Sequence, residues 1–175
     1  MARSRGALLA QGIRTKLHEL AEVCETADEN EAVLAPAGRW SPKEILSHLW
    51  GREGSGYLPI LQAYLDADCP TIDIDPGNPF YSDQRAEMAT PRLLAEVIGE
   101  YERIASFAER LSDAQLDRKA RIPKLKESPI GEYPTLEQLV GGLGEFHLQF
   151  HIDHLREIVA ALSPEGDGQR TGERR

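Results

Sequence analysis

TLEQLVGGLGEFHLQFHIDHLREIVAAL, residues 135–162, has the pattern of one long amphipathic helix. Thr135, followed three positions later by Gln138, matches the capping-box pattern that often starts a helix. Apolar residues then recur at steps of three and four, which is the period of a helix face. They are Leu136, Leu139, Val140, Leu143, Phe146, Phe150, Leu155, Ile158 and Val159. We expect this helix to form one wall of the domain, with the apolar stripe facing the core.

Three further segments carry the same helical period, and they cover residues 7–27, 41–65 and 91–111. The second has the strongest start, because Ser41, Pro42 and Glu44 combine a capping box with a proline at the first helical position. Glycines and a proline predict a kink or break in it around residues 54–59. No convincing strand pattern is present. The sequence therefore predicts an all-α four-helix bundle.

Proline-containing connections join these helices, and two of them are long. Residues 66–90 form a long link, and links of this length are often functional or mobile. Its aromatic pair Phe80–Tyr81 could fold back over a cleft or simply anchor the loop. Five Lys and Arg residues at 118–126 could receive an anionic ligand or lie in solvent. We expect one domain over residues 1–163 and a disordered polar tail over residues 164–175.

Composition narrows the classes of partner. The chain of 175 residues has a net charge of −9 and no basic stripe, which disfavours binding to nucleic acid or to anionic membranes. No apolar run approaches the roughly 20 residues of a membrane span, and the N-terminal apolar run is too short for a secretory signal. Cys24 and Cys69 form no C-x-x-C motif and are expected to be reduced thiols. These features predict a cytoplasmic protein.

The helix at 135–162 carries three of the chain's five histidines, His147, His151 and His154. His147 and His151 are four positions apart and so lie one turn apart on one face, where their rings could share a metal ion. One helix cannot easily surround an ion. His48, on the apolar side of the second helix, could supply the ligand from elsewhere.

Two alternatives are open for these histidines. They could be ordinary core residues without a metal ion, or their spacing could have arisen by chance. Imidazoles clustered in an apolar interior would repel one another when protonated and would need hydrogen-bond partners when neutral. A metal ion meets both requirements. The pattern therefore predicts a three-histidine metal site, with His154 nearby on the same general stripe.

RWSPKEILSHL at residues 39–49, followed far downstream by HLQFHIDHLREI at 147–158, resembles the DinB/YfiT-like family of metal-binding four-helix bundles. The likeness spans residues 7–162. It implies a long connection between helices 2 and 3 and metal ligands at His48, His147 and His151. His154 falls where relatives often have Gln or His, so it would shape the site or hydrogen-bond to it. The glycine-rich GREGSG at 51–56 departs from the family, whose helix more often continues smoothly.

The resemblance also implies a type of reaction. Three protein ligands leave an open coordination position that admits water or substrate. Several relatives are S-transferases or isomerases that use low-molecular-weight thiols, and neutral imidazoles leave the divalent charge intact to favour a thiolate. We expect a metal-dependent enzyme, with zinc the first choice and nickel the second, that transfers such a thiol to a small electrophile. Metal-dependent hydrolysis and a non-catalytic metal- or ligand-binding stress protein stay open. Relatives often dimerise, so a homodimer is expected.

The sequence assigns no catalytic general base. Glu53 lies about 140° around the helix from His48, and Glu145 points away from His147. Tyr57 and Tyr101 are candidates for lining the cleft, and core packing is the alternative for both.

Overall fold

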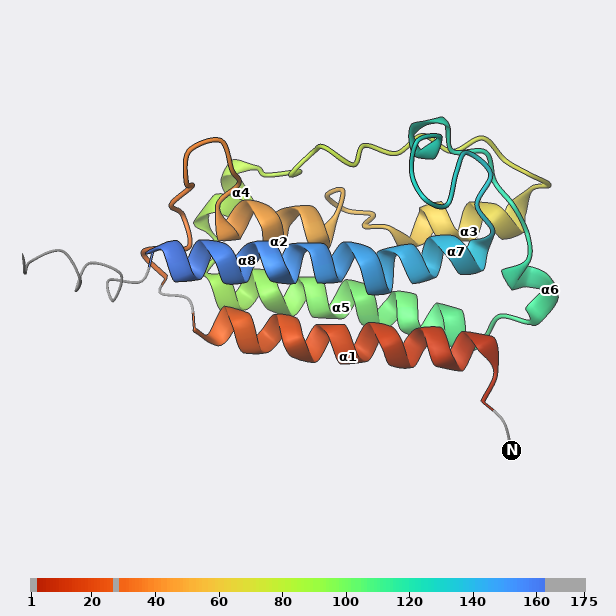
Figure 1. Ribbon diagram of the computed structural model, residues 1–175, viewed down its shortest axis with the longest axis horizontal. Coiled ribbons are helices and arrows are strands. Elements are labelled where there is room, and N and C mark those ends of the chain that lie inside the picture. The colour runs from red at the N-terminus through yellow and green to blue at the C-terminus, as the bar shows by residue number, and fades with distance from the viewer. Residues whose placement is uncertain (1–2, 27–28, 163–175) are drawn as a thin grey trace, which may run out of the picture.

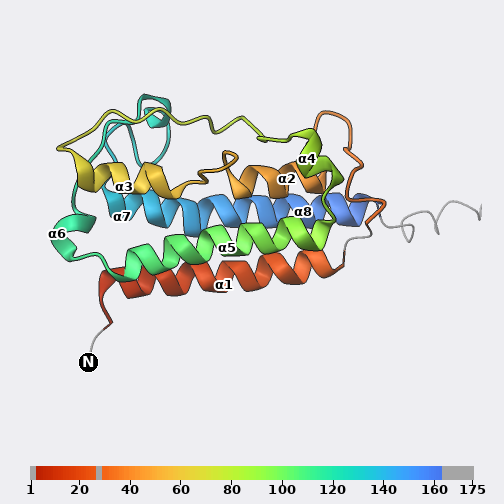
Figure 2. The same ribbon diagram turned by 180° about the vertical axis from the view of Figure 1, so that it is seen from behind.

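The computed structural model describes residues 3–26 and 29–162. Its helices form four rods, which Figures 1 and 2 show from opposite sides. The rods are α1 (Arg5–Glu25), α2 (Pro42–Trp50) in line with α3 (Leu58–Asp66), α5 (Thr90–Glu109), and α7 (Leu136–Gly141) continued through the π-helical turn η2 (Gly142–His147) into α8 (Leu148–Leu162). The all-α four-helix bundle predicted from the sequence is confirmed. The tail expected at 164–175 lies outside the described residues.

Short elements complete the fold, namely α4 (Asp83–Glu87), α6 (Asp113–Leu116) and η1 (Pro123–Leu125). The pairing of extended chain among the described residues is limited to isolated bridges, Thr71 with Arg121 and Lys119 with Thr135. The first bridge fastens the two long connections to each other, and the second joins the two ends of the connection before α7.

The order of the rods places the long connection over α2. The chain between α3 and α5 runs back along the α2–α3 rod, so α5 starts beside the beginning of α2 (Figures 1 and 2). As a result, α5 runs in the same direction as α2 and α3, while α1 and the α7–α8 rod run the opposite way. Residues near 80 therefore return to the part of α2 that carries His48.

The core lies between the four rods and is built mainly from aliphatic side chains. Each rod contributes a stripe at helical spacing, as the sequence predicted. Fully buried members include Ala10, Ile13, Leu20, Ile45, Leu46, Leu49, Leu61, Leu93, Val97, Ile104, Leu136, Val140, Leu148, Ile152 and Ile158.

Both predicted capping boxes are present. The Ser41 hydroxyl accepts the Glu44 amide at 3.2 Å, and the Glu44 carboxylate accepts the Ser41 amide at 2.7 Å. Thr135 and Gln138 form the same reciprocal pair at the start of α7. These bonds satisfy amide groups that have no partner inside the helix and fix where α2 and α7 begin.

The π-helical turn η2 corrects one expectation. Phe146 and Phe150 were expected to face the core, but they are 73% and 65% exposed. A π-helical turn holds one more residue than an α-helical turn, so it rotates every later side chain by about 100° relative to a continuous α-helix. The rotation moves both phenylalanines to the surface and puts Leu148, Ile152 and Leu155 in the core instead.

The predicted break in the second rod is present and begins at Gly51, earlier than expected. A buried carboxylate from α5 starts the next helix, because Glu100 accepts the amides of Tyr57 at 2.6 Å and Leu58 at 3.2 Å. Gly56 has φ +61°, and a Cβ there would lie 2.3 Å from the Glu100 carboxylate. Glycine is therefore required for the chain to turn around Glu100.

Three side chains of the basic stretch 118–126 are engaged within the protein. Arg118 donates to the carbonyls of Tyr64 and Ala67, Arg121 pairs with Glu132, and Lys124 pairs with Asp73. Cys24 and Cys69 are free thiols. Of the helices in the described part of the chain, none has both the length and the apolar character needed to cross a membrane.

Candidate metal centre

His48 lies near the end of α2 and points into the bundle. The capping box sets the start of this helix, and His48 follows Ile45 by one turn on the buried side. Only 2% of its surface is exposed. The expectation that His48 faces inward is confirmed.

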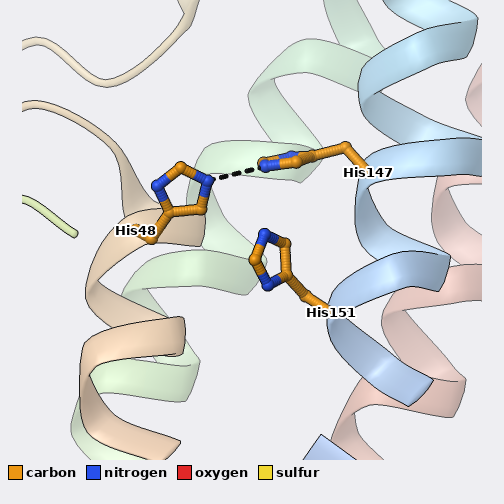
Figure 3. A group of neighbouring side chains, drawn as sticks. All are labelled: His48, His147 and His151. Carbon is orange, nitrogen blue, oxygen red and sulfur yellow. Dashed lines mark hydrogen bonds between the residues drawn. The ribbon is translucent and has the colours of Figure 1, made fainter. Parts of the chain in front are cut away.

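His147 and His151 come from the opposite rod, where His147 ends η2 and His151 lies in the first turn of α8. The structure brings these two together with His48, as Figure 3 shows. One nitrogen from each ring lies within 4.8 Å of the other two, a grouping that could hold a metal ion. The Nε2 atoms of His48 and His147 are 2.8 Å apart. Residues 99 positions apart in the chain thus meet at one point.

A backbone carbonyl fixes the tautomer of His48. The Asn78 carbonyl oxygen lies 2.7 Å from His48 Nδ1. A carbonyl can only accept a hydrogen bond, so Nδ1 carries the proton and Nε2 of the neutral ring carries a lone pair. That lone pair faces His147, in the orientation a metal ligand requires.

The hydroxyl of Tyr101 on α5 lies 3.1 Å from His147 Nδ1. Because His48 Nε2 carries a lone pair, a hydrogen bond between the two Nε2 atoms requires the proton on His147 Nε2. Tyr101 then donates to His147 Nδ1. The hydroxyl can also accept from Nδ1–H, which would leave a lone pair on His147 Nε2 for a cation.

His151 completes the group and lacks a hydrogen bond at one nitrogen. Its ring is turned toward the other two imidazoles (Figure 3), and the exposed fraction of the residue is only 4%. Its Nδ1 is buried and has no hydrogen-bond partner in the described residues. The lone pair on His48 Nε2 and the three clustered imidazoles fit a divalent cation, for which neutral imidazole is a common ligand.

Four aromatic side chains surround the imidazoles. The Trp40 ring is nearly parallel to His151, with centroids 6.1 Å apart, and the Phe80 ring is nearly parallel to His48 at 6.3 Å. Phe150 meets His151 edge-on at 5.0 Å, and Tyr57 meets His147 edge-on at 6.1 Å. These rings cover the imidazole cluster on several sides.

Burial and mutual repulsion keep the histidines neutral. Burial lowers the pKa of His147 to about 3, with the neighbouring His48 adding to the effect. Burial and the other histidines lower the pKa of His151 to about 2, and burial also lowers the pKa of His48. The neutral form that binds metal therefore persists at mildly acidic pH.

Acidification is expected to destabilise the metal-free protein. An unfolded histidine has a pKa of 6.5, so below that pH the unfolded chain binds protons that folded His147 and His151 do not. The stability they contribute is full above pH 6.5 and falls as the pH drops toward 3, by at most about 1.4 kcal/mol per pH unit for each residue. Urea midpoints measured from neutral to mildly acidic pH will report the slope. His151→Ala should flatten it, whereas the exposed His18→Ala should not; equal slopes in both variants would contradict the assignment.

Other candidates from the sequence lie outside the trio. His154 is half-buried, with its ring 6.3 Å from that of His151, and its Nδ1 has no partner in the described residues. Glu53 and Glu145 are exposed. Tyr57 and Tyr101 both contact the histidines, since the Tyr57 hydroxyl donates to the His48 carbonyl at 2.6 Å.

Two contributions to the site are missing from the sequence-based prediction. One is the carbonyl of Asn78, which cannot be recognised from residue type because every residue has a carbonyl. The other is Trp40, whose ring lies against both His48 and His151. Its fixed position just before the Ser41 cap is the signal that could have revealed it. Phe80 does fold back onto the site, one of the two roles considered for the Phe80–Tyr81 pair.

Comparison with known proteins identifies the family of this chain. The family model described as the DinB superfamily matches residues 13–164. No curated protein matches the sequence. Among solved structures, YfiT from Bacillus subtilis matches with a TM-score of 0.72 and 19% identity, over 92% of this chain and 89% of that one. It is described as a probable metal-dependent hydrolase with an unusual four-helix bundle topology. The present chain belongs to the DinB superfamily.

Proposed function

We propose that this protein binds a divalent metal ion through His48, His147 and His151 and is a metal-dependent enzyme acting on a small molecule. The observation that carries the proposal is the convergence of three imidazoles, two of them buried and that of His147 partly buried, with one nitrogen of each within 4.8 Å of the other two. Zinc is the first expectation and nickel the second, since imidazole suits both. When bound, the ion would act as a Lewis acid that favours the anionic form of a coordinated group.

The preferred reaction is transfer of a low-molecular-weight thiol to a small electrophile. The supporting feature is the ligand set, because neutral imidazoles do not offset the charge of the ion and so favour binding of a thiolate. The protein's own groups would prepare the site. Asn78 accepts the proton of His48 Nδ1, Tyr101 can accept that of His147 Nδ1, and Trp40 and Phe80 limit access of water.

Metal-dependent hydrolysis is the second candidate. It is favoured by the description of Bacillus subtilis YfiT as a probable metal-dependent hydrolase, a protein with the same fold. The two reactions differ in whether a thiol is consumed, so one assay can separate them.

The test begins with metal analysis of untagged protein, because an affinity tag would add histidines. We expect one equivalent of zinc or nickel. The loaded protein is then tested on small electrophiles and esters, with and without low-molecular-weight thiols. Turnover that requires thiol supports transfer, and turnover without thiol supports hydrolysis. Tightly bound metal without turnover would favour a non-catalytic binding protein, and absence of bound metal would refute the proposal. Homodimerisation stays a prediction that light scattering of the same sample will check.

A further inference from the structure

Arg85 is buried in an unusual environment. Only 1% of its surface is exposed. Its guanidinium donates to the carbonyls of Ser47 at 2.9 Å and Gly51 at 2.8 Å, at the end of α2. It also lies over the Trp50 ring, with its central carbon 4.1 Å from the ring centroid. Arg85 thus caps the carbonyl end of the helix that carries His48, where a positive charge is favourable.

Burial of this cation is only partly compensated. The Nε and Nη2 atoms of Arg85 have no hydrogen-bond partner in the described residues. Burial of a charge is unfavourable unless hydrogen bonds and opposite charges offset it. The bonds that Arg85 does make run from Nη1 to the end of α2 and to the long connection, so they join these two parts of the chain.

Arg85 also reaches the long connection, at a point where the backbone is strained. The same guanidinium nitrogen lies 3.3 Å from the Phe80 carbonyl, which in addition accepts the Ser47 hydroxyl at 3.0 Å. Phe80 has φ +49°, a region that non-glycine residues rarely adopt. Such strain persists only where the surrounding contacts enforce it, and it is common at functional sites.

Side-chain bonds hold the rest of this turn, residues 75–80, in shape. The Asn78 side-chain oxygen accepts the Phe80 amide at 2.7 Å, and its nitrogen donates to Asp75 at 3.0 Å. The turn presents two groups to His48, the Asn78 carbonyl that accepts Nδ1–H and the Phe80 ring that stacks on the imidazole. The contact that fixes the His48 tautomer therefore depends on a turn anchored to α2 through Ser47 and Arg85.

We infer that Arg85 is a positioning residue, which holds the 75–80 turn against α2 so that His48 keeps its proton on Nδ1 and its lone pair on Nε2. The inference rests on the proposed metal site, but the tautomer of His48 is a property of the metal-free protein. The inference and the metal proposal can therefore fail separately.

The test compares Arg85→Met with a matched control, Arg118→Met. Both arginines donate to backbone carbonyls near a helix end, but Arg118 contacts Tyr64 and Ala67 at the end of α3 and does not touch the 75–80 turn. Nitrogen-15 NMR of the metal-free proteins at neutral pH reports which His48 nitrogen carries the proton. Titration with zinc then reports affinity. Ser47→Ala is the milder second variant, because it removes one hydroxyl, which donates to the Phe80 carbonyl at 3.0 Å and accepts from Arg85 at 3.1 Å.

We expect wild-type and Arg118→Met proteins to show His48 protonated on Nδ1. Arg85→Met should show a mixture of the Nδ1–H and Nε2–H forms of His48. If Arg85→Met does not fold, Ser47→Ala should show this mixture instead. Zinc affinity should fall by about 10–100-fold, the usual effect of removing support for a metal-ligating histidine. If both variants retain the Nδ1–H form, or Arg118→Met shifts the tautomer as far as Arg85→Met does, the inference is wrong. If the wild type binds no zinc, the metal proposal fails and the tautomer measurement alone decides the inference.

Discussion

Replacing His48 with alanine is expected to abolish stoichiometric binding of a divalent metal. His48 is the one member of the trio that α2 supplies, and the remaining pair lies one turn apart on a single rod, which cannot surround an ion by itself. Metal at about 100 times its dissociation constant should raise the free energy of unfolding of the wild-type protein by about 2.7 kcal/mol. The variant should gain almost nothing.

Metal content and urea unfolding with and without zinc will measure this effect. His18→Ala is the matched control, because His18 is exposed on α1 and far in sequence from the trio. His154→Ala separates the roles of the neighbours on α8. If His154 only shapes the site, its variant should keep one equivalent of metal. Retention of metal by His48→Ala, combined with loss in His154→Ala, would show that the ligand set is wrong.

Gly144→Ala is expected to destabilise the protein by about 1–3 kcal/mol, the usual range for an overpacked core. A Cβ at this position would lie 2.4 Å from Cγ1 of Ile13, a side chain of α1 that is 1% exposed. The Ile13 side chain is packed in the core and cannot withdraw easily. The π-helical turn would have to move away from α1, and His147 at its end would move with it.

Gly142→Ala provides the control within the same turn. Its Cβ would meet only Ile130, at an ordinary distance of 3.9 Å, so the better helix propensity of alanine should leave stability unchanged or raise it by up to about 1 kcal/mol. The double variant Gly144→Ala with Ile13→Ala tests the cause, since truncating Ile13 removes the clash. Urea unfolding should show that the two losses are less than additive. Strict additivity would exclude the Ile13 contact as the reason for glycine.

The helix starts and the inward position of His48 were predictable because they depend on residues close together in the chain. A capping box joins groups three positions apart, so Ser41 with Glu44 and Thr135 with Gln138 can be recognised without knowing what surrounds them. The same holds for His147 and His151, whose spacing fixes their common face.

The π-helical turn was not predictable in the same way. Three glycines at 141–144 are a signal of irregularity inside a helical pattern. They do not predict a turn with one extra residue, because nothing within an isolated helix favours a π-helical turn. The approach of Ile13 at Gly144 belongs to the packing of α1. A prediction made from the helical period alone therefore placed Phe146 and Phe150 on the wrong face.

The sequence by itself determined the bundle, the starts of α2 and α7 and the residue types that could bind a metal. These follow from local hydrogen bonds and from apolar periodicity, which act over one or two turns. Only the tertiary structure decided which nitrogen of His48 carries a proton, because the Asn78 carbonyl reaches Nδ1. It also decided that Arg85 is buried against the Phe80 carbonyl of the same turn. Those features depend on carbonyl groups brought together from distant parts of the chain, and a carbonyl has no signature in the sequence.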